Sequence, residues 1–263
     1  MPKKIAPVLL PVLTGGLFVA LWYAFHFTMS EERRFLLPTF GDVLLAFRDN
    51  HAALLGAALN TLKGAVIGLC AAVAISFVLA LLLSLSPLVR SSVYPYLMML
   101  QMTPVIVLAP ILILWAGPGL PSVVVITFLI CFFPMVVNTT QGLVSTDRNL
   151  VELFRMCRAT RRQELLFLRV PAALPYFFTG LRIAATLGPI GAIVGDFTAG
   201  NSGGDGGGLG YLSIIYSAQF KMPALFATAL SGCLLGFGFV AVVIWLSWLA
   251  LHNWHDSHAK ADA

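Results

Sequence analysis

Residues 147–171 read DRNLVELFRMCRATRRQELLFLRVP and interrupt a chain that otherwise consists mostly of long apolar runs. This stretch carries six of the sixteen lysine and arginine residues of the protein, namely Arg148, Arg155, Arg158, Arg161, Arg162 and Arg169. A basic, amphipathic segment between membrane spans is typical of the cytoplasmic side of a bilayer. The stretch therefore predicts a membrane protein that presents a helical surface to a soluble partner.

The composition indicates a protein dissolved in lipid. Hydrophobic residues make up 59% of the 263 positions and charged residues 10%, whereas a soluble domain has about 25% charged residues. We expect the net charge of +5 to set membrane orientation rather than to bind nucleic acid. The cysteines show no close-paired spacing, so neither a disulfide framework nor a zinc site is predicted.

Six apolar stretches are long enough to cross a hydrocarbon core, which requires about 20 helical residues. They cover roughly residues 5–28, 64–85, 93–116, 122–141, 172–198 and 224–251. The first follows Lys3 and Lys4 as a signal peptide would, but its apolar run is too long, so we interpret it as a span. The predicted fold class is an all-α polytopic membrane protein with about six transmembrane helices, forming one domain over residues 1–263 with a flexible tail at 252–263.

Lysines and arginines sort the loops into two sets. Lys3, Lys4, Arg90, the arginines of residues 148–169 and Lys260 fall on one side of the predicted bundle. The other side holds residues 31–50, the uncharged turn at 117–121 and a glycine-rich loop that ends near Lys221. Positive charge favours the cytoplasmic side, so both termini are predicted to be cytoplasmic.

The fifth span contains two ionisable residues, Arg182 and Asp196. The thirteen residues between them span about 20 Å of helix, which is less than a core of about 30 Å. Either both side chains snorkel to opposite faces, or the helix lines an aqueous pathway and both charges face it. Pro189 between them favours a bent helix under both alternatives.

Small residues and prolines give further expectations about packing. The pairs Gly64/Gly68, Gly191/Gly195 and Gly232/Gly236 have the four-residue spacing that lets helix backbones approach closely. Pro104, Pro110 and Pro134 lie in the third and fourth spans, where we expect kinked packing helices.

The basic stretch itself has helical periodicity. Leu150, Leu153, Phe154 and Cys157 recur at i, i+3, i+4 and i+7 and so form one face of a helix. A second short helix is predicted over residues 161–168, ending before Pro171. Two interpretations remain open: an interfacial helix on anionic lipid, or a docking helix whose apolar face fills a groove on a soluble protein.

This stretch resembles the cytoplasmic signature of the binding-protein-dependent ABC importer permeases, E-A-A-x3-G-x9-I-x-L-P. The positions that match in place are Glu152, Leu168 at the isoleucine, Val170 at the leucine, and Pro171. Three positions depart from it. Leu153 and Phe154 stand where the family has alanines, and Arg158 stands where the family has the glycine of a turn between two short helices.

The resemblance extends over most of residues 36–251 and points to the nitrate, sulfonate and taurine branch of that family. The matching pieces are Gln101 with Pro104, Asn138 with Gly142, residues 179–182, residues 191–196 and residues 208–212. Asp196 stands where that branch usually has glutamate, and the loop at 201–208 is unusually rich in glycine.

The resemblance implies a type I importer in the bacterial inner membrane. Two copies of this permease would form the pathway, two cytoplasmic ATPases would drive it with ATP and Mg, and an external binding protein would deliver the solute. The chain has no G-x4-G-K-[ST] phosphate loop, so we expect a transport subunit that is not itself an enzyme and binds no cofactor.

The resemblance also implies roles for individual residues. ATPase coupling is expected in a segment of about residues 147–170 and its flank, through Glu152, Leu153, Phe154, Cys157, Arg158, Leu168 and Pro171. The candidates for the pathway are Gln101, Pro104, Arg182, Pro189 and Asp196.

The alternative function is an ion-coupled secondary transporter, which would place ionisable groups near the midplane. Only Arg182 and Asp196 come near that position. A metal site at His252, His255 and His258 is not expected, because these residues lie on a charged C-terminal tail. The branch is associated with nitrate, alkanesulfonates, taurine, and pyrimidine or flavin vitamin precursors. The sequence favours a small organic solute, sulfonate-like or a vitamin precursor.

Overall fold

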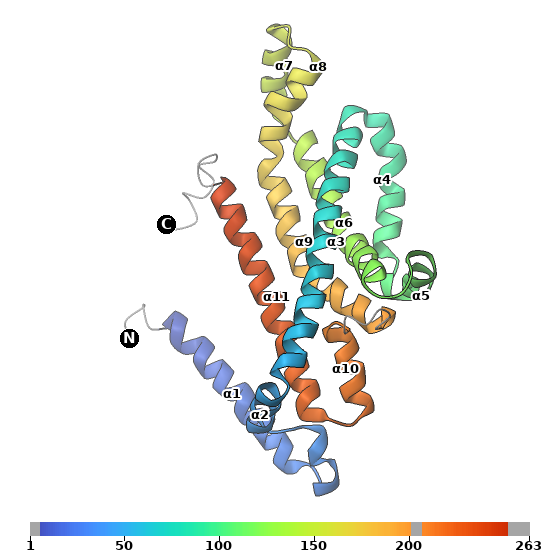
Figure 1. The fold of residues 1–263 in the computed structure, drawn as a ribbon. Coiled ribbons are helices and arrows are strands. Elements are labelled where there is room, and N and C mark those ends of the chain that lie inside the picture. The colour runs from blue at the N-terminus through green and yellow to red at the C-terminus, as the bar shows by residue number, and fades with distance from the viewer. Residues whose placement is uncertain (1–5, 201–206, 252–263) are drawn as a thin grey trace.

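The computed structural model describes residues 6–200 and 207–251, and all regular elements in these ranges are helices (Figure 1). In chain order they are α1 (Ala6–Thr28), η1 (Glu31–Leu36), α2 (Phe40–Asp49), α3 (His51–Leu85), α4 (Pro87–Met102), α5 (Val105–Ala116), α6 (Leu120–Val144), α7 (Arg148–Met156), α8 (Arg161–Glu164), the π-helical turn η2 (Leu165–Arg169), α9 (Val170–Ala199), α10 (Leu209–Ala218) and α11 (Met222–Leu251). Five helices are long and apolar enough to cross a membrane, and the bent pair α4–α5 makes a sixth if it counts as one broken span. The predicted all-α polytopic fold class is confirmed.

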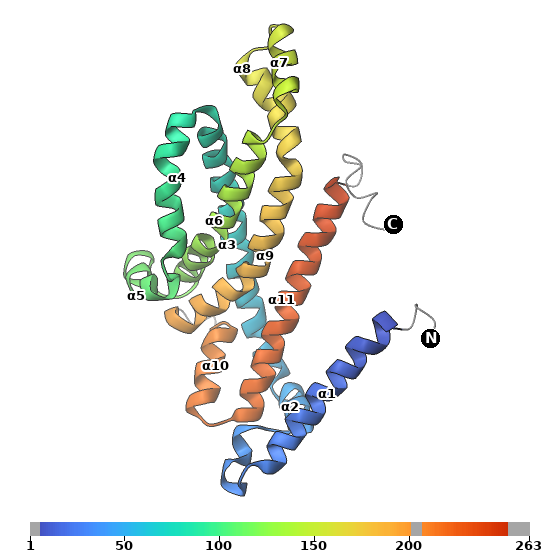
Figure 2. The same cartoon turned by 180° about the vertical axis from the view of Figure 1, so that it is seen from behind.

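The centre of the bundle is α6, which packs on α9 and on α3 (Figures 1 and 2). Val123 and Thr127 of α6 lie between two glycine pairs, one on each neighbouring helix. A Cβ at Gly64 would lie 2.6 Å from Val123 Cγ1, and one at Gly68 would lie 2.6 Å from Thr127 Cβ. A Cβ at Gly191 or Gly195 would lie 3.1 or 2.9 Å from the Cα of Thr127 or Val123. The close approach predicted for these two pairs is confirmed.

The third glycine pair, Gly232/Gly236 on α11, is not a tight contact. A Cβ at Gly232 would lie 3.2 Å from Ile193 Cδ1, and a Cβ at Gly236 would have no neighbour within 4 Å. Both residues instead line a surface groove of about 570 Å³ between α9, α10 and α11. The spacing alone did not distinguish a packed pair from an open one.

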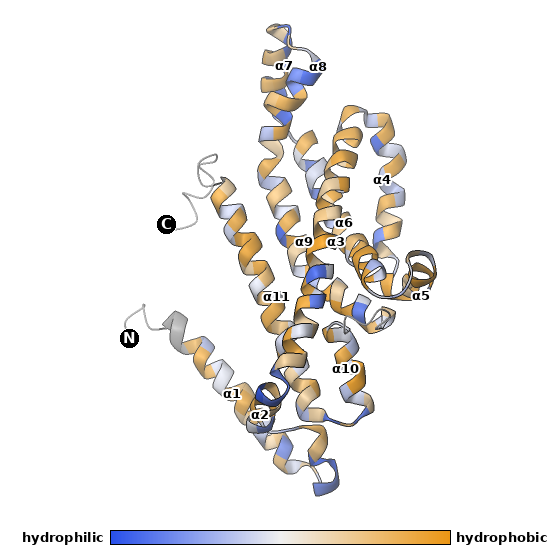
Figure 3. Cartoon of the chain, in the orientation of Figure 1, coloured by the Kyte–Doolittle hydropathy of each residue, from blue (hydrophilic) through white to orange (hydrophobic). Residues whose placement is uncertain are grey.

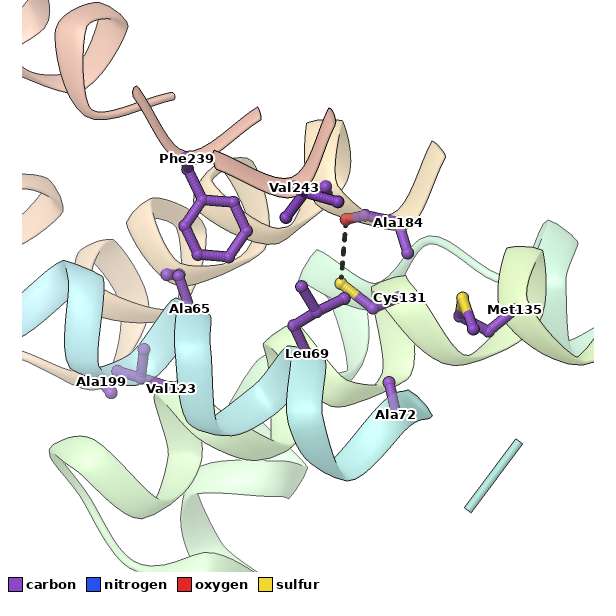
Figure 4. Packing of buried hydrophobic residues seen from close by; sticks show 12 residues of the cluster. Ala65, Leu69, Ala72, Val123, Cys131, Met135, Ala184, Ala199, Phe239 and Val243 are labelled. Carbon is purple, nitrogen blue, oxygen red and sulfur yellow. Dashed lines mark hydrogen bonds between the residues drawn. The ribbon is translucent and has the colours of Figure 1, made fainter. Parts of the chain in front are cut away.

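Alanines and short side chains fill the space around α6 (Figure 4). Cys131 is buried there, and its Sγ donates a hydrogen bond of 3.3 Å to the carbonyl oxygen of Ala184 on α9. Phe239 and Val243 of α11 cover the same region from the other side of α9. These contacts place α9 between α6 and α11.

The expected third span is a broken one rather than a kinked one. The axes of α4 and α5 are bent by 97°, and Thr103 and Pro104 between them have extended backbone conformations. Proline has no N–H to continue α4 and disfavours a helical residue before it. Pro110 and Pro134, by contrast, lie inside α5 and α6.

The second span also begins earlier than expected. Helix α3 starts at His51 rather than near Gly64 and has 35 residues, about 52 Å at 1.5 Å per residue. Asn60, Thr61 and Lys63 interrupt the apolar run but are all compatible with a helix. Hydropathy therefore located the strongly apolar part of α3 but not the residue at which the helix begins.

Helix α1 is fastened to the rest of the chain near its C-terminal end. Trp22 Nε1 donates to the carbonyl oxygen of Pro38 at 3.0 Å, and its ring lies edge-on to Phe226 with 5.3 Å between centroids. His26 Nδ1 lies 2.6 Å from the carbonyl oxygen of Leu37. The connection into α2 is closed by a capping box in which Thr39 lowers the pKa of the Asp42 carboxyl by hydrogen bonding.

The two ends of the bundle differ in character. Helices α7 and α8 project from one end, whereas η1, α2 and the far end of α10 lie at the other (Figures 1 and 2). Hydrophilic residues concentrate at these ends, and apolar residues dominate between them (Figure 3). The chain-terminal ends of α1 and α11 both point towards the α7–α8 end. The expected tail, its histidines and Lys3, Lys4 and Lys260 lie outside the described residues.

We predict that Gly195→Ala destabilises the bundle, because the added Cβ meets the backbone of α6 rather than a mobile side-chain end. Overpacking of this kind costs about 1–3 kcal/mol, and it should lower the midpoint of thermal unfolding in detergent. Gly236→Ala is the matched control, since its Cβ enters open space and alanine favours helix by about 1 kcal/mol. Equal midpoints for the two variants would contradict the packing described.

Candidate functional site

Helix α7 is an exposed amphipathic helix at the tip of the molecule (Figure 1). It begins at its N-cap Asp147, whose Oδ1 accepts a 2.9 Å hydrogen bond from the Asn149 N–H, and none of its nine residues is buried. On its predicted apolar face Leu153 is 53% exposed, and Phe154 is half-buried. Glu152 is exposed as well. The amphipathic helix is present, and its apolar face is left largely uncovered by the described chain.

The turn after α7 has the geometry that the family signature requires, although arginine replaces glycine. Arg158 has φ +54°, in the left-handed region. The Ala159 N–H donates to the carbonyl oxygen of Phe154 and the Arg158 N–H to that of Arg155, at 3.0 and 2.9 Å. These are the two bonds of a Schellman turn, which usually has glycine at this position. Arginine keeps the turn at a cost of about 1–2 kcal/mol.

Helix α8 restarts immediately after this turn. Thr160 Oγ1 accepts from the Gln163 N–H, and Gln163 Oε1 accepts from the Thr160 N–H at 2.8 Å, which together make a capping box. Such a box satisfies two donors that a helix start otherwise leaves unpaired. The chain reversal between α7 and α8 is therefore closed by local bonds on both sides.

The helix that begins at α8 does not end before Pro171, so that prediction is wrong. It continues through the π-turn η2 into α9, giving one helical run over residues 161–199. The Val170 N–H donates to Leu165 O, five residues back. A proline ring clashes with the carbonyl four residues before it, here that of Phe167. The wider π-turn contains this carbonyl and accommodates Pro171 without ending the helix.

Glu164 is a residue of this segment that the sequence analysis missed. It is 8% exposed. Its Oε1 accepts from Arg169 Nε at 2.8 Å and from Arg169 Nη2, and its Oε2 lies 3.6 Å from Arg155 Nε on α7. The carboxylate thus ties α7 to the base of α9. Glu164 and Arg169 are five residues apart, whereas side chains that pair along an α-helix are three or four residues apart. The sequence spacing therefore did not indicate this pair.

The remaining coupling candidates lie along the same element. Cys157 is an exposed free cysteine at the C-cap of α7. Leu168 and Pro171 are half-buried, on η2 and at the first turn of α9. The structure therefore gathers all seven candidates on one continuous piece of chain from α7 to the start of α9.

The pathway candidates are not brought together in one place. Gln101 and Pro104 are exposed on either side of the bend between α4 and α5. Pro189 is buried in α9 and borders the groove beside α11. Arg182 is half-buried on α9, and its Nε has no hydrogen-bond partner among the described residues.

Asp196, the fifth candidate, is 5% exposed and is bonded within the chain. Its Oδ2 accepts a 2.5 Å hydrogen bond from Thr61 Oγ1 on α3, and it also accepts from the Gly210 N–H. Thr61 Oγ1 in turn accepts from the Leu209 N–H at 2.8 Å. The sequence left two possibilities for Asp196, snorkelling to a membrane face or facing an aqueous pathway, and the structure shows a third, a carboxylate enclosed by the chain. Its hydrogen bonds join α3, α9 and the start of α10.

Glycines beside Asp196 make this junction possible. A Cβ at Gly208 would overlap the Asp196 carboxylate, and one at Gly210 would overlap the carbonyl of Ile193. The two glycines of the sequence GLG at 208–210 therefore allow α10 to start directly against α9. Within residues 6–200 and 207–251, no group of three histidine, cysteine, aspartate or glutamate residues is placed to hold a metal ion.

A bundle of membrane-length helices with a basic helical element projecting from one end defines a polytopic membrane protein. Residues 52–260 match the family described as binding-protein-dependent transport system inner membrane component. The chain belongs to this family, and it is a permease of an ABC importer for small solutes, in the bacterial inner membrane. Family membership implies ATPase and substrate-binding protein partners.

Three relatives show the range of this similarity. The chain is 41% identical over 242 residues to a formylaminopyrimidine transport permease protein of Halalkalibacterium halodurans, covering 91% of this chain and 94% of the relative. It is 39% identical over 132 residues to a riboflavin transport system permease protein of Chloroflexus aurantiacus, covering 50% and 47%. It is 27% identical over 212 residues to a putative aliphatic sulfonates transport permease protein of Bacillus subtilis, covering 80% and 74%.

We predict that Glu164→Gln loosens α7 from α9. Neutralising the carboxylate removes charge-assisted hydrogen bonds worth about 1.5 kcal/mol or more, and it should speed trypsin cleavage at Arg161 and Arg162 roughly tenfold. Cleavage is measured on the full chain in detergent. Glu152→Gln removes an exposed carboxylate of the same segment and is the control, with an unchanged rate. Equal rates for both variants would show that Glu164 does not hold the segment closed.

Proposed function

We propose that this permease forms the translocation pathway for a planar nitrogen heterocycle of the vitamin-precursor kind, and that α7 couples it to a cytoplasmic ATPase. The observation that carries the solute class is the 41% identity over nearly the full length of a formylaminopyrimidine permease, against 27% for a sulfonate permease. The riboflavin permease, whose solute is also a planar nitrogen heterocycle, is 39% identical over the part that matches.

The docking role of α7 is supported by its position and its surface. Figure 1 shows α7 projecting beyond the ends of α3, α4 and α11, away from the long apolar helices. A helix lying on lipid would instead run beside the ends of those helices. The uncovered apolar residues Leu150 and Leu153, with Met156 beside them, suit insertion into a groove on a soluble protein.

The route from α7 into the membrane follows one continuous helical run, residues 161–199. Glu164 holds α7 against the run of 39 helical residues that becomes α9. A displacement of α7 by the ATPase would tilt α9 and change which side of the membrane the pathway faces. Nucleotide on one side and loaded binding protein on the other would then bias a two-state element.

The proposed assembly contains two copies of this chain, two ATPase subunits that use ATP and Mg, and an external binding protein. Gln101, Pro104, Arg182, Pro189 and Asp196 remain the candidates for the pathway, with both termini on the ATPase side. An ion-coupled secondary transporter is disfavoured, because the family that the chain belongs to works with a binding protein.

We predict that Glu152→Ala detaches the ATPase. Truncating a hot-spot residue of an interface costs about 2 kcal/mol, roughly thirtyfold. ATPase retention on the affinity-purified permease should fall accordingly and uptake should stop, at unchanged membrane abundance. Glu32→Ala, an exposed glutamate of η1 at the opposite end, serves as control and should transport normally. Arg158→Glu should also weaken ATPase docking and abolish transport, because it reverses a charge of the docking segment. Arg158→Gly should transport, because glycine fits the left-handed turn. Full transport by Glu152→Ala would rule out its docking role.

We predict that uptake selects the heterocycle. The permease, its ATPase and its binding protein are reconstituted in liposomes with a labelled formylaminopyrimidine and ATP inside. Unlabelled riboflavin, taurine and an alkanesulfonate are then added as competitors. We expect uptake of the labelled formylaminopyrimidine, and we expect neither taurine nor the sulfonate to inhibit it. Uptake of taurine or the sulfonate in place of the pyrimidine would reject the solute class, and uptake without ATP would reject the importer mechanism.

A further inference from the structure

A basic cleft of about 740 Å³ lies between the base of α7–α9 and the turn that joins α3 to α4. Its lining includes five arginines and two glutamates, which leave a net charge of +3. Hydroxyl groups of Ser84, Ser86 and Thr146 also border it. Neither the family match nor the coupling role of α7 explains why so many cations converge on one cavity.

Two of the five arginines share one carboxylate, that of Glu164. Glu164 bonds Arg169 and lies beside Arg155, so these three side chains form one ionic group with a net charge of +1. The other three are Arg90 on α4, Arg148 at the start of α7 and Arg161 at the start of α8. Within the described residues none of these three forms an ion pair, and only Glu152 remains as an acid in the lining.

The backbone adds to the positive potential. Ser86 and Pro87, the N-cap and first residue of α4, line the cleft, so the positive end of the α4 dipole borders it. An anion in the cleft would interact favourably with this helix end and with three arginines from three different helices.

The rim of the cleft indicates where the anion comes from. Leu85 lines the cleft at the α3–α4 turn, and Leu88 and Val89 adjoin the lining; they are 53%, 79% and 45% exposed. Leu85 is the last residue of α3, a helix along which hydrophobic residues predominate (Figure 3). A basic pocket at the end of an apolar helical surface is the setting in which phospholipid headgroups bind membrane proteins.

We propose that this cleft binds a phosphate ester, held by Arg90, Arg148 and Arg161, and that its source is the headgroup of an anionic phospholipid. The acyl chains would lie on the apolar surface below Leu88. Bound there, the lipid would bridge the α3–α4 turn and the α7–α8 element. The site is separate from the exposed apolar face of α7, and its existence does not depend on the proposed solute or on ATPase docking.

The test uses the full chain in detergent. Its thermal unfolding is followed while phosphatidylglycerol, phosphatidylcholine or inorganic phosphate is added, and native mass spectrometry counts retained lipids. We expect phosphatidylglycerol, and not phosphatidylcholine, to raise the unfolding midpoint. Arg90→Gln and Arg148→Gln should each weaken this response about fivefold, the effect of one arginine at an anionic surface. Arg162→Gln is the matched control, since Arg162 is exposed in the same segment and does not line the cleft.

The other outcomes are equally informative. Stabilisation by inorganic phosphate, lost in the same two variants, would support the phosphate site but assign it to a soluble ligand. Equal responses of the wild-type chain, Arg90→Gln and Arg148→Gln to phosphatidylglycerol would overturn the proposal. An unchanged lipid response together with loss of the co-purifying ATPase would also overturn it, because the cleft would then be a protein contact.

Discussion

The close approach of α6 to α9 and α3 is the constraint on which the rest of the structure depends. Lipid removes the hydrophobic drive between helices, so they associate through van der Waals contact between backbones brought near by small residues. Gly64 and Gly68 face α6 from one side, and Gly191 and Gly195 face it from the other. With α6 held in this way, α9 and α3 acquire fixed positions, and only then can Thr61 of α3 reach Asp196 of α9.

Two enclosed carboxylates join short helices to the long helical run of α8 to α9, one near each end. Glu164 ties α7 to its beginning, and Asp196 ties the start of α10 to its end. Both carboxylates are buried with their partners in place, because an unpaired charge there would cost several kcal/mol. The long run is therefore the element that connects the projecting helix α7 with the start of α10.

Local geometry explains how unusual residues are tolerated in the projecting element. Arg158 occupies a left-handed position that glycine prefers, and two Schellman hydrogen bonds hold it there. Pro171 sits inside a continuous helix because the π-turn before it widens the backbone. The family signature predicted the position of the turn, since a helix reversal is encoded by neighbouring residues. It did not predict that the helix continues through Pro171. A single π-turn shifts the backbone hydrogen bonds, and the types of residue in the segment do not reveal that shift.

The sequence by itself determined the lipid environment, the number of membrane-length segments and the amphipathic helix predicted at residues 149–157, and the family resemblance added the turn at Arg158. Hydropathy, charge and helical periodicity are properties of residues close together in the chain, so these features needed no knowledge of the fold. Only the tertiary structure decided that Asp196 is enclosed by Thr61, that Glu164 pairs with Arg155 and Arg169, and that Gly236 faces a groove while Gly195 faces a helix. Thr61 and Asp196 are 135 residues apart, and Glu164 and Arg169 pair across a π-turn. Such partners depend on which helices pack together and in which register, and no local pattern in the chain specifies that.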